Sequence, residues 1–263
     1  WDMVDEMLKF PEESSNFVEY YTTLYFPKIL MGILAAIGEF YFIKFVRKIY
    51  MATTDKTKDE KADSLKLTLQ IASVLTLSNF FNCFLITRTY INSFEMILTS
   101  ISLYYWDWTG GEMIRTSEFS KSLAISMLAC LQRPTNAFIW ISLGGFMILN
   151  LISSGKYAQI FYLFKKLMVV FLVVFAINAA IDFYFYKEMV FPVFRFIKFN
   201  FTSSLSKFYG VAPWHFHLLQ SLPILLGYCL PFFVLGFATK LTSKRFVPWF
   251  KNPFFQFKFV IVT

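Results

Sequence analysis

Long stretches of uncharged, mostly apolar residues alternate with short charged segments along the chain. Residues 67–87 give 21 consecutive positions without a charge, residues 134–155 give 22, and residues 208–239 give 32 if both histidines are neutral. Residues 29–43 and 89–106 are each interrupted by one glutamate only. About 20 apolar residues in a helix cross a hydrocarbon core of about 30 Å. The pattern predicts an all-α, polytopic membrane protein.

We expect one transmembrane domain over residues 1–263. Two of its spans are short and are separated by Arg133 and Pro134, and a proline removes a backbone donor and kinks or ends a helix. Broken helices at membrane depth are tolerated only where protein or a water-filled cavity surrounds them, so a polar environment is expected there. The predicted spans are residues 26–47, 67–87, 89–106, 119–132, 136–152, 160–181 and 218–240.

Composition agrees with a membrane location. Hydrophobic residues make up 57% of the chain and charged residues 16%, against about 25% charged in soluble domains. The net charge of +8 does not point to nucleic acid, because that inference needs a basic face on a soluble domain. The first residue is Trp1 and the last residues form a short apolar run. We therefore expect a fragment of a longer protein.

Lysine and arginine are distributed unevenly between alternate loops. One set of loops and flanking residues carries 16 of them and the other carries eight. Since cytoplasmic loops carry the excess, the loop at residues 48–66 is predicted to be cytoplasmic. The loop at residues 182–217 is then luminal or extracellular. It contains the glycosylation sequon at Asn200, although its apolar setting disfavours modification.

Polar residues recur along residues 88–106 at helical spacing. Ionisable groups in a spanning helix are costly and usually face a bundle interior or a cavity, which indicates a functional site. The structural alternative is that Arg88 lies at the helix end and reaches the interface while Glu95 bonds to another helix. Intervals of 4, 3, 4 and 3 place one set on a common face: Arg88, Asn92, Glu95, Thr99 and Ser102.

Arg133 and Thr135 are a second candidate for ligand binding. A guanidinium at the non-cytoplasmic end of a broken hairpin can grip a phosphate with its planar fork, and the threonine can add a hydroxyl. Arg133 reaching to lipid headgroups is the alternative. For the intramembrane Glu39, a structural hydrogen bond is favoured over catalysis.

Both histidines of the chain lie in one segment, residues 207–223. Two residues apart, they point to different sides of a helix, and neither a carboxylate nor a third ligand accompanies them, so no metal site is expected. An aromatic belt at the membrane interface and a ligand site both fit this segment, and the neighbouring polar groups favour the ligand site. Its candidate residues are Tyr209, Trp214, His215, His217 and Gln220.

No other cofactor signature is present. Cys83, Cys130 and Cys229 lie far apart in apolar segments, which indicates buried thiols rather than a zinc site or a disulfide framework. There is no glycine-rich phosphate loop and no GxSxG, kinase or P-loop set, so neither soluble nucleotide chemistry nor a cofactor is expected.

Five segments together resemble a known family. In order, they are similar to the dolichyl-phosphate-mannose-dependent mannosyltransferases of the endoplasmic reticulum, which belong to the GT-C superfamily. "FxKFN" followed by "FYGxxPWHxxxxQxxP" most resembles the fungal members that add the third mannose of the GPI anchor. The segments are FPKILMGILAAIGEFYFIKF (26–45), TRTYINSFEMILTSISLYYW (87–106), LQRPTNAFIW (131–140), FIKFNF (196–201) and FYGVAPWHFHLLQSLP (208–223).

The resemblance implies a GT-C-like helical bundle in the endoplasmic reticulum membrane. It implies transfer of mannose from dolichyl phosphate mannose, with inversion and an alpha-1,2 linkage, to a dimannosyl GPI-precursor glycolipid on the luminal face. In this interpretation Arg88 and Arg133 contact the lipid phosphate or its neighbours. Trp214, His215, His217 and Gln220 line the donor or acceptor pocket. Membrane lipids are the surroundings, and no protein partner is indicated.

The chain departs from the family pattern at its N-terminus. Family members carry a luminal Asp-Glu motif well before the stretch that matches residues 26–32, and its Asp is the presumed general base. Asp5 and Glu6 lie too close to Pro27 for that role, so the base is expected upstream of Trp1, and we also expect the C-terminal part to be missing. Ala212 and His217 replace a histidine and an aromatic residue of the closest relatives, which weakens assignment to one acceptor.

Two alternatives to this function stay open. A sister mannosyltransferase of N-glycan assembly shares the architecture and acts on a dolichol-linked oligosaccharide. A membrane transporter or lipid-binding protein without enzymatic activity can also place Arg and Glu in the bilayer, although the inverted repeats common in transporters are not found.

Overall fold

The computed structural model describes residues 12–53, 58–202, 208, 210 and 212–242. These residues form helices joined by short turns, and no strand occurs among them. The helices follow one another as α2 (Glu12–Thr53), α3 (Lys58–Ser78), α4 (Phe80–Leu85), α5 (Ile91–Tyr105), α6 (Ser117–Gln132), η1 (Pro134–Asn136), α7 (Ala137–Ser153), α8 (Tyr157–Tyr186), α9 (Pro192–Ile197), η2 (Lys198–Thr202), η4 (His217–Ser221), α10 (Leu222–Leu226), η5 (Gly227–Cys229) and α11 (Leu230–Thr242).

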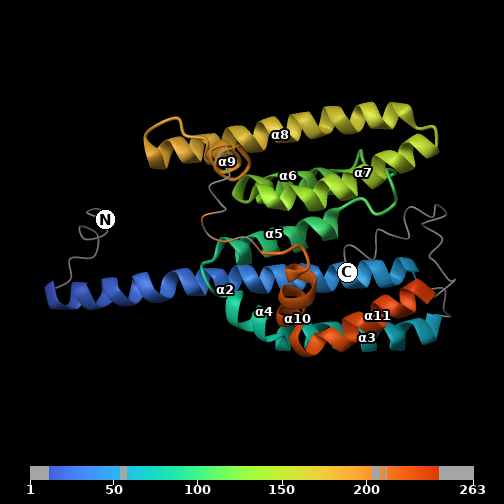
Figure 1. Ribbon diagram of the computed structural model, residues 1–263, viewed down its shortest axis with the longest axis horizontal. Helices are drawn as coiled ribbons and strands as arrows, with labels where there is room; N and C mark the ends of the chain where they lie inside the picture. The colour runs from blue at the N-terminus through green and yellow to red at the C-terminus, as the bar shows by residue number, and fades with distance from the viewer. Residues whose placement is uncertain (1–11, 54–57, 203–207, 209, 211, 243–263) are drawn as a thin grey trace.

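The helices lie side by side in an elongated bundle (Figure 1). The order across the bundle is α8, α6, α5, α2 and α3, and each of these helices contacts the next. Helix α7 packs beside α8, and α10 and α11 lie near α3 in Figure 1. Residues distant in the chain therefore meet at the two faces of α5.

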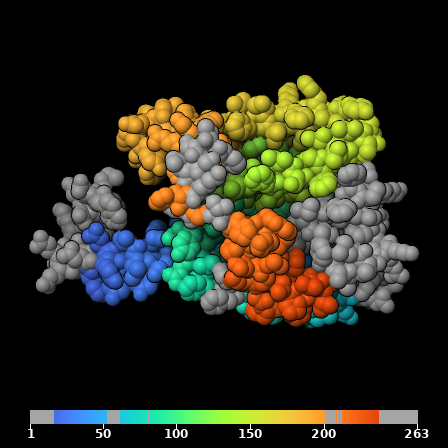
Figure 2. Space-filling view, in the orientation of Figure 1, coloured from blue at the N-terminus to red at the C-terminus, as the bar shows by residue number. Residues whose placement is uncertain are grey.

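The apolar residues of the outer helices face outwards. Helix α8 has a mean hydropathy of 2.4 over its most apolar window, of which only 6% is buried. Phe161 is 76% exposed and Phe185 74% exposed. In Figure 2 the N-terminal part of α2, in blue, projects from the bundle, and Phe17, Tyr20 and Phe26 are exposed on it. Soluble proteins seldom expose so much apolar surface, so this is the surface of a membrane protein.

Within the part of the chain that the structure describes, four helical segments are long and apolar enough to cross a bilayer: Phe17–Ala52, Pro134–Ser153, Tyr157–Tyr186 and His217–Gly236. The all-α membrane fold is therefore confirmed. Residues 67–87, 89–106 and 119–132 fall on α3 with α4, on α5 and on α6. These are broken or shorter helices, and their crossing of the membrane stays a prediction.

The core of the bundle is built around residues 106–116, which connect α5 to α6. Trp106, Trp108 and Ile114 are buried against α6, α7 and α8. The fully buried Asp107 holds the turn, because its carboxylate accepts bonds from the backbone N–H groups of Thr109 and Met113, each at 2.8 Å. The turn fixes one end of α5 relative to α6 and α7.

The predicted break at Arg133 and Pro134 is present. Helix α6 ends at Gln132, and Arg133 is extended, with φ −140° and ψ 106°. A residue before proline disfavours the helical region, so the chain changes direction before the short helix η1 leads into α7. This extended residue directs the Arg133 side chain towards α5.

Helix α8 continues to Tyr186, and the predicted loop at 182–217 contains α9 and η2; its placement outside the membrane stays a prediction. Within it, Asn200 donates a hydrogen bond to the Phe196 carbonyl at 2.9 Å. The cysteines are less buried than expected, since Cys83 is exposed and Cys130 and Cys229 are intermediate. Cys130 and Cys229 line cavities between helices, which leaves them partly accessible.

Candidate functional site

A polar cluster joins α5 to the break between α6 and α7. We call it the Arg133–Glu95 cluster. Arg133 Nη1 lies 3.2 Å from Glu95 Oε2 and also donates a hydrogen bond to Asn92 Oδ1. Asn92 and Glu95 lie one turn apart on α5, so both reach the same neighbour. The cluster consists of Asn92, Glu95, Thr99, Arg133, Asn136 and Trp140.

Asn136 forms the buried part of this cluster. Its Nδ2 donates to Glu95 Oε1 at 2.9 Å and to Thr99 Oγ1 at 3.0 Å. Its Oδ1 accepts a bond from Trp140 Nε1 at 2.6 Å. Asn136 is 2% exposed, and a buried amide is stable when its donors and acceptor are used. Both oxygens of Glu95 are therefore engaged, and Glu95 acts as an anchor rather than as a free base.

Arg133 remains accessible within the cluster. Its side chain is 32% exposed and that of Glu95 is 17% exposed. Both of its contacts use Nη1, and neither Nη2 nor Nε donates a hydrogen bond to any residue in the described part of the chain. A guanidinium carries five N–H donors in a fixed fork. Arg133 can therefore keep its two partners and present further donors to an anion such as a phosphate.

The structure brings together only part of the predicted site. Asn92, Glu95 and Arg133 meet, and Thr135 is exposed beside Arg133. Arg88 precedes α5, which begins at Ile91, so it is not on the helical face that the spacing predicted. Its guanidinium instead lies 4.6 Å from the ring centroid of Phe84.

The histidine segment does not meet this cluster among the described residues. Trp214 is 82% exposed, and His215, His217 and Gln220 are exposed as well. His217 Nδ1 lies 3.5 Å from Ser221 Oγ. Tyr209 lies outside the described residues. A role for these side chains in binding therefore stays a prediction.

Two members of the cluster were not predicted. Asn136 and Trp140 lie three and seven residues after Arg133 in LQRPTNAFIW. Asn136 and Trp140 are four residues apart, which places them on one face of the helical segment that follows Pro134. Two polar groups on one face of an otherwise apolar segment are the signal that indicates them.

No metal site is evident. Within the described ranges no group of three or more His, Cys, Asp or Glu side chains could hold a metal ion.

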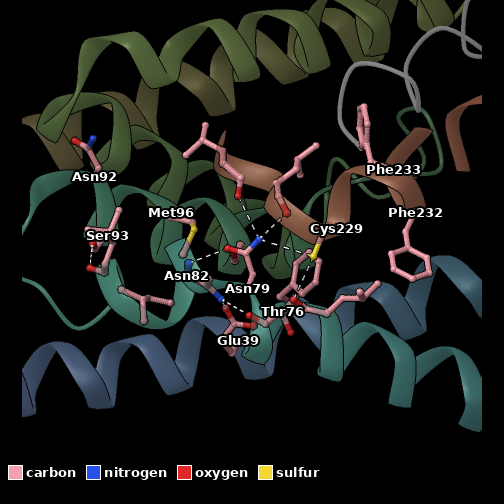
Figure 3. A pocket seen from close by; sticks show the side chains of 17 residues that line it. Glu39, Thr76, Asn79, Asn82, Asn92, Ser93, Met96, Cys229, Phe232 and Phe233 are labelled. Carbon is pink, nitrogen blue, oxygen red and sulfur yellow. Dashed lines mark hydrogen bonds between the residues drawn. The ribbon is translucent and has the colours of Figure 1, made fainter. Parts of the chain in front are cut away.

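A cavity of about 720 Å³ lies next to the cluster. It begins at Asn92 and Ser93 and extends towards Glu39 (Figure 3). The cluster thus borders a space large enough for a ligand.

Comparison with known proteins identifies relatives of this sequence. The chain is 53% identical to the GPI mannosyltransferase 3 of Kluyveromyces lactis over its whole length, covering 44% of that protein. It is 50% identical to the Saccharomyces cerevisiae GPI mannosyltransferase 3, over all of this chain and 43% of that protein. For the Candida glabrata GPI mannosyltransferase 3 the identity is 53%, over 99% of this chain and 42% of that protein.

The chain therefore spans less than half the length of the curated relatives that it matches. No solved structure matches it. The model of the Alg9-like mannosyltransferase family matches residues 7–263. The chain belongs to the Alg9-like mannosyltransferase family.

Proposed function

We propose that the protein containing this chain transfers mannose from dolichyl phosphate mannose to a GPI-precursor glycolipid. It adds the third mannose in an alpha-1,2 linkage on the luminal face of the endoplasmic reticulum membrane. The observation that carries this proposal is the sequence identity of 50–53%, over 99–100% of this chain, to three proteins named GPI mannosyltransferase 3. Membership of a mannosyltransferase family favours an enzyme over a transporter.

The Arg133–Glu95 cluster supports a role for this chain in binding the donor. Transfer requires a base for the acceptor hydroxyl and stabilisation of the phosphate that leaves the sugar. Arg133 is suited to the second task, because Glu95 and Asn92 hold one nitrogen while the rest of the fork is accessible. The base is not assigned to any residue of this chain.

Transfer of mannose by the full-length protein tests both proposals. Membranes from cells that lack the endogenous enzyme are supplied with dolichyl phosphate mannose and a dimannosyl GPI precursor, and mass spectrometry follows the gain of one hexose. A dolichol-linked oligosaccharide serves as the competing acceptor. Gain of a hexose on that oligosaccharide alone would assign the protein to N-glycan assembly instead.

Substitution of Arg133 separates the donor role from the overall function. Arg133→Ala is expected to lower the rate by about 10²-fold or more, since loss of one preorganised donor to developing charge has that effect. Arg47→Ala is the matched control, because Arg47 is an exposed arginine near the C-terminal end of α2 and does not belong to the cluster. Transfer at the wild-type rate by Arg133→Ala would reject the role of Arg133 and leave the proposed function intact.

A further inference from the structure

The cavity next to the Arg133–Glu95 cluster lies where two helices of the bundle are broken. We call it the Glu39 cavity. It lies between α2, the junction of α3 and α4, the first ten residues of α5, and the junction of α10 and α11 (Figure 3). Glu39, Asn79 and Asn82 provide polar groups on one side. The remaining wall is largely apolar and includes Met96, Leu225 and Phe232.

The two breaks stabilise each other. Asn79 interrupts the helix after Ser78, has φ −61° and ψ 118°, and accepts a bond from the Asn82 backbone N–H at 3.0 Å. Gly227, with φ 51°, separates α10 from α11. The Asn79 amide donates across to the Leu225 carbonyl at 3.2 Å. The break at Gly227 leaves backbone carbonyls without helical partners, and the Asn79 side chain at the other break supplies a donor to one of them. Broken helices in a membrane require such replacement partners.

Glu39 and Asn82 retain hydrogen-bonding capacity at this junction. Asn82 Nδ2 donates to Glu39 Oε1 at 2.7 Å and to the Thr76 carbonyl at 3.0 Å. Glu39 Oε2 and Asn82 Oδ1 are buried and accept no bond from any residue that the structure describes. Both atoms are acceptors. A buried acceptor without a donor is unfavourable, so the pair matches a ligand that brings at least two donors.

The shape of the cavity admits the head of a lipid. Asn92 and Ser93, in the first turn of α5, line one end, and Ser100 lines a position about 12 Å further along the helix. The start of α5 is predicted to lie at the non-cytoplasmic edge of the bilayer, where headgroups reside. The apolar wall, which includes Met96 and Phe232, then suits the attached hydrocarbon chain.

We propose that the Glu39 cavity binds a membrane lipid whose headgroup donates hydrogen bonds from an ammonium or a hydroxyl. Glu39 Oε2 and Asn82 Oδ1 accept those bonds. An anionic headgroup without donors is disfavoured, because both orphan atoms are oxygens and one belongs to a carboxylate. The proposal concerns a site distinct from Arg133 and does not depend on mannose transfer.

A series of lipids with constant charge and decreasing donor number tests it. The full-length protein is purified with phosphatidylethanolamine, its N-methyl and N,N-dimethyl derivatives or phosphatidylcholine, all with the same acyl chains, and native mass spectrometry measures the lipid retained. These headgroups carry three, two, one and no N–H donors. Since two acceptors need two donors, retention is expected to hold for the first two lipids and to fall about tenfold by phosphatidylcholine.

Glu39→Gln is the sharpest variant. A glutamine can still accept the Asn82 bond through its oxygen, but it replaces the orphan oxygen by an NH₂ group, which cannot accept. The preference for phosphatidylethanolamine over phosphatidylcholine is expected to disappear. Glu112→Gln, at an exposed position outside the cavity, is expected to keep it. If Glu39→Gln does not fold, Met96→Trp narrows the cavity while leaving the Glu39 residue unchanged, and it is expected to reduce retention of every donor lipid.

Phosphatidylglycerol, tested in parallel, distinguishes hydroxyl from ammonium donors. Retention of both phosphatidylglycerol and phosphatidylethanolamine would show that the site accepts bonds from hydroxyl and ammonium groups alike. Retention of phosphatidylethanolamine alone would show that it requires the ammonium. Equal retention of all lipids by the wild-type protein, or an unchanged preference in folded Glu39→Gln, would overturn the proposal. Neither result would alter the mannose-transfer assay.

Discussion

Asn136 joins three helical segments through one side chain. It bonds Glu95 and Thr99 on α5 and Trp140 on α7, while lying in the turn next to Arg133. Because Asn136 holds Glu95 Oε1, Glu95 Oε2 remains directed at Arg133. The position of the arginine therefore depends on a buried amide that need not touch any substrate.

The coupling between Glu95 and Arg133 can be measured as a stability difference. Glu95→Gln removes the charge partner of a partly buried arginine and is expected to lower the free energy of unfolding by about 1–3 kcal/mol. Arg133→Gln combined with it should recover part of this loss, with a coupling energy of about 1–2 kcal/mol. Thermal unfolding of the full-length protein in detergent gives the free energies of unfolding of the wild type, the two single variants and the double variant. Losses that simply add would show that the 3.2 Å contact contributes no net stability.

Four of the six members of the Arg133–Glu95 cluster, Asn92, Glu95, Thr99 and Arg133, were predicted from the sequence. The spacing of Asn92, Glu95 and Thr99 places them on one face of a helix, and the structure uses all three. Their pairing with residues 41 positions away depends on how α5 and α6 pack, which helical periodicity does not specify. The same periodicity extended the face to Arg88, although the helix begins only at Ile91.

At the scale of helices, the contact between α2 and α5 depends on small residues. A methyl group added at Gly38 would lie 3.1 Å from Cγ1 and 3.2 Å from Cα of Ile97. Met31 and Ala35 pack against the same isoleucine from α2. The two helices therefore approach so closely at position 38 that even a methyl group requires Ile97 to shift, as small residues allow at many helix contacts in membranes.

Gly38→Ala is expected to destabilise the protein by about 1–3 kcal/mol, since the backbone at Ile97 cannot move away without shifting α5. Gly144→Ala on α7 is the matched control, because no atom lies within 4 Å of the added methyl group, and alanine favours a helix over glycine by about 1 kcal/mol. Thermal unfolding compares the two variants. Equal stability of both would indicate that α2 and α5 are not packed as the structure shows.

The breaks in the helices differ in how well the sequence indicates them. Proline at 134 removes a donor and restricts the residue before it, so this break follows from covalent geometry. Asn79 interrupts an uncharged run without any proline. Its break depends on hydrogen bonds with Asn82 and Leu225, and Leu225 belongs to a helix 146 residues later in the chain. Such a break cannot be predicted from local sequence.

At the scale of the whole molecule, the direction in which the bundle crosses the membrane is still a prediction from charge. The short turn between α7 and α8 at residues 154–156 belongs to the positively charged set of loops, and the residues after α8 belong to the other set. Helix α8 is 30 residues long, or about 45 Å. A helix of this length can cross a hydrocarbon core of about 30 Å, so we expect its two ends to lie on opposite sides of the membrane.

Cysteine labelling in sealed vesicles with the cytoplasmic face outward tests this orientation. In a functional variant without its native cysteines, Ser154→Cys is expected to react with a membrane-impermeant maleimide at once, because Ser154 is exposed in the turn before α8. Met189→Cys, at a side chain that is 69% exposed beyond the other end, should react only after detergent is added. The reverse pattern would place Asn92 and the mouth of the Glu39 cavity on the cytoplasmic side. Arg133 would then be unable to meet a luminal donor, so this result would also reject its proposed role in transfer.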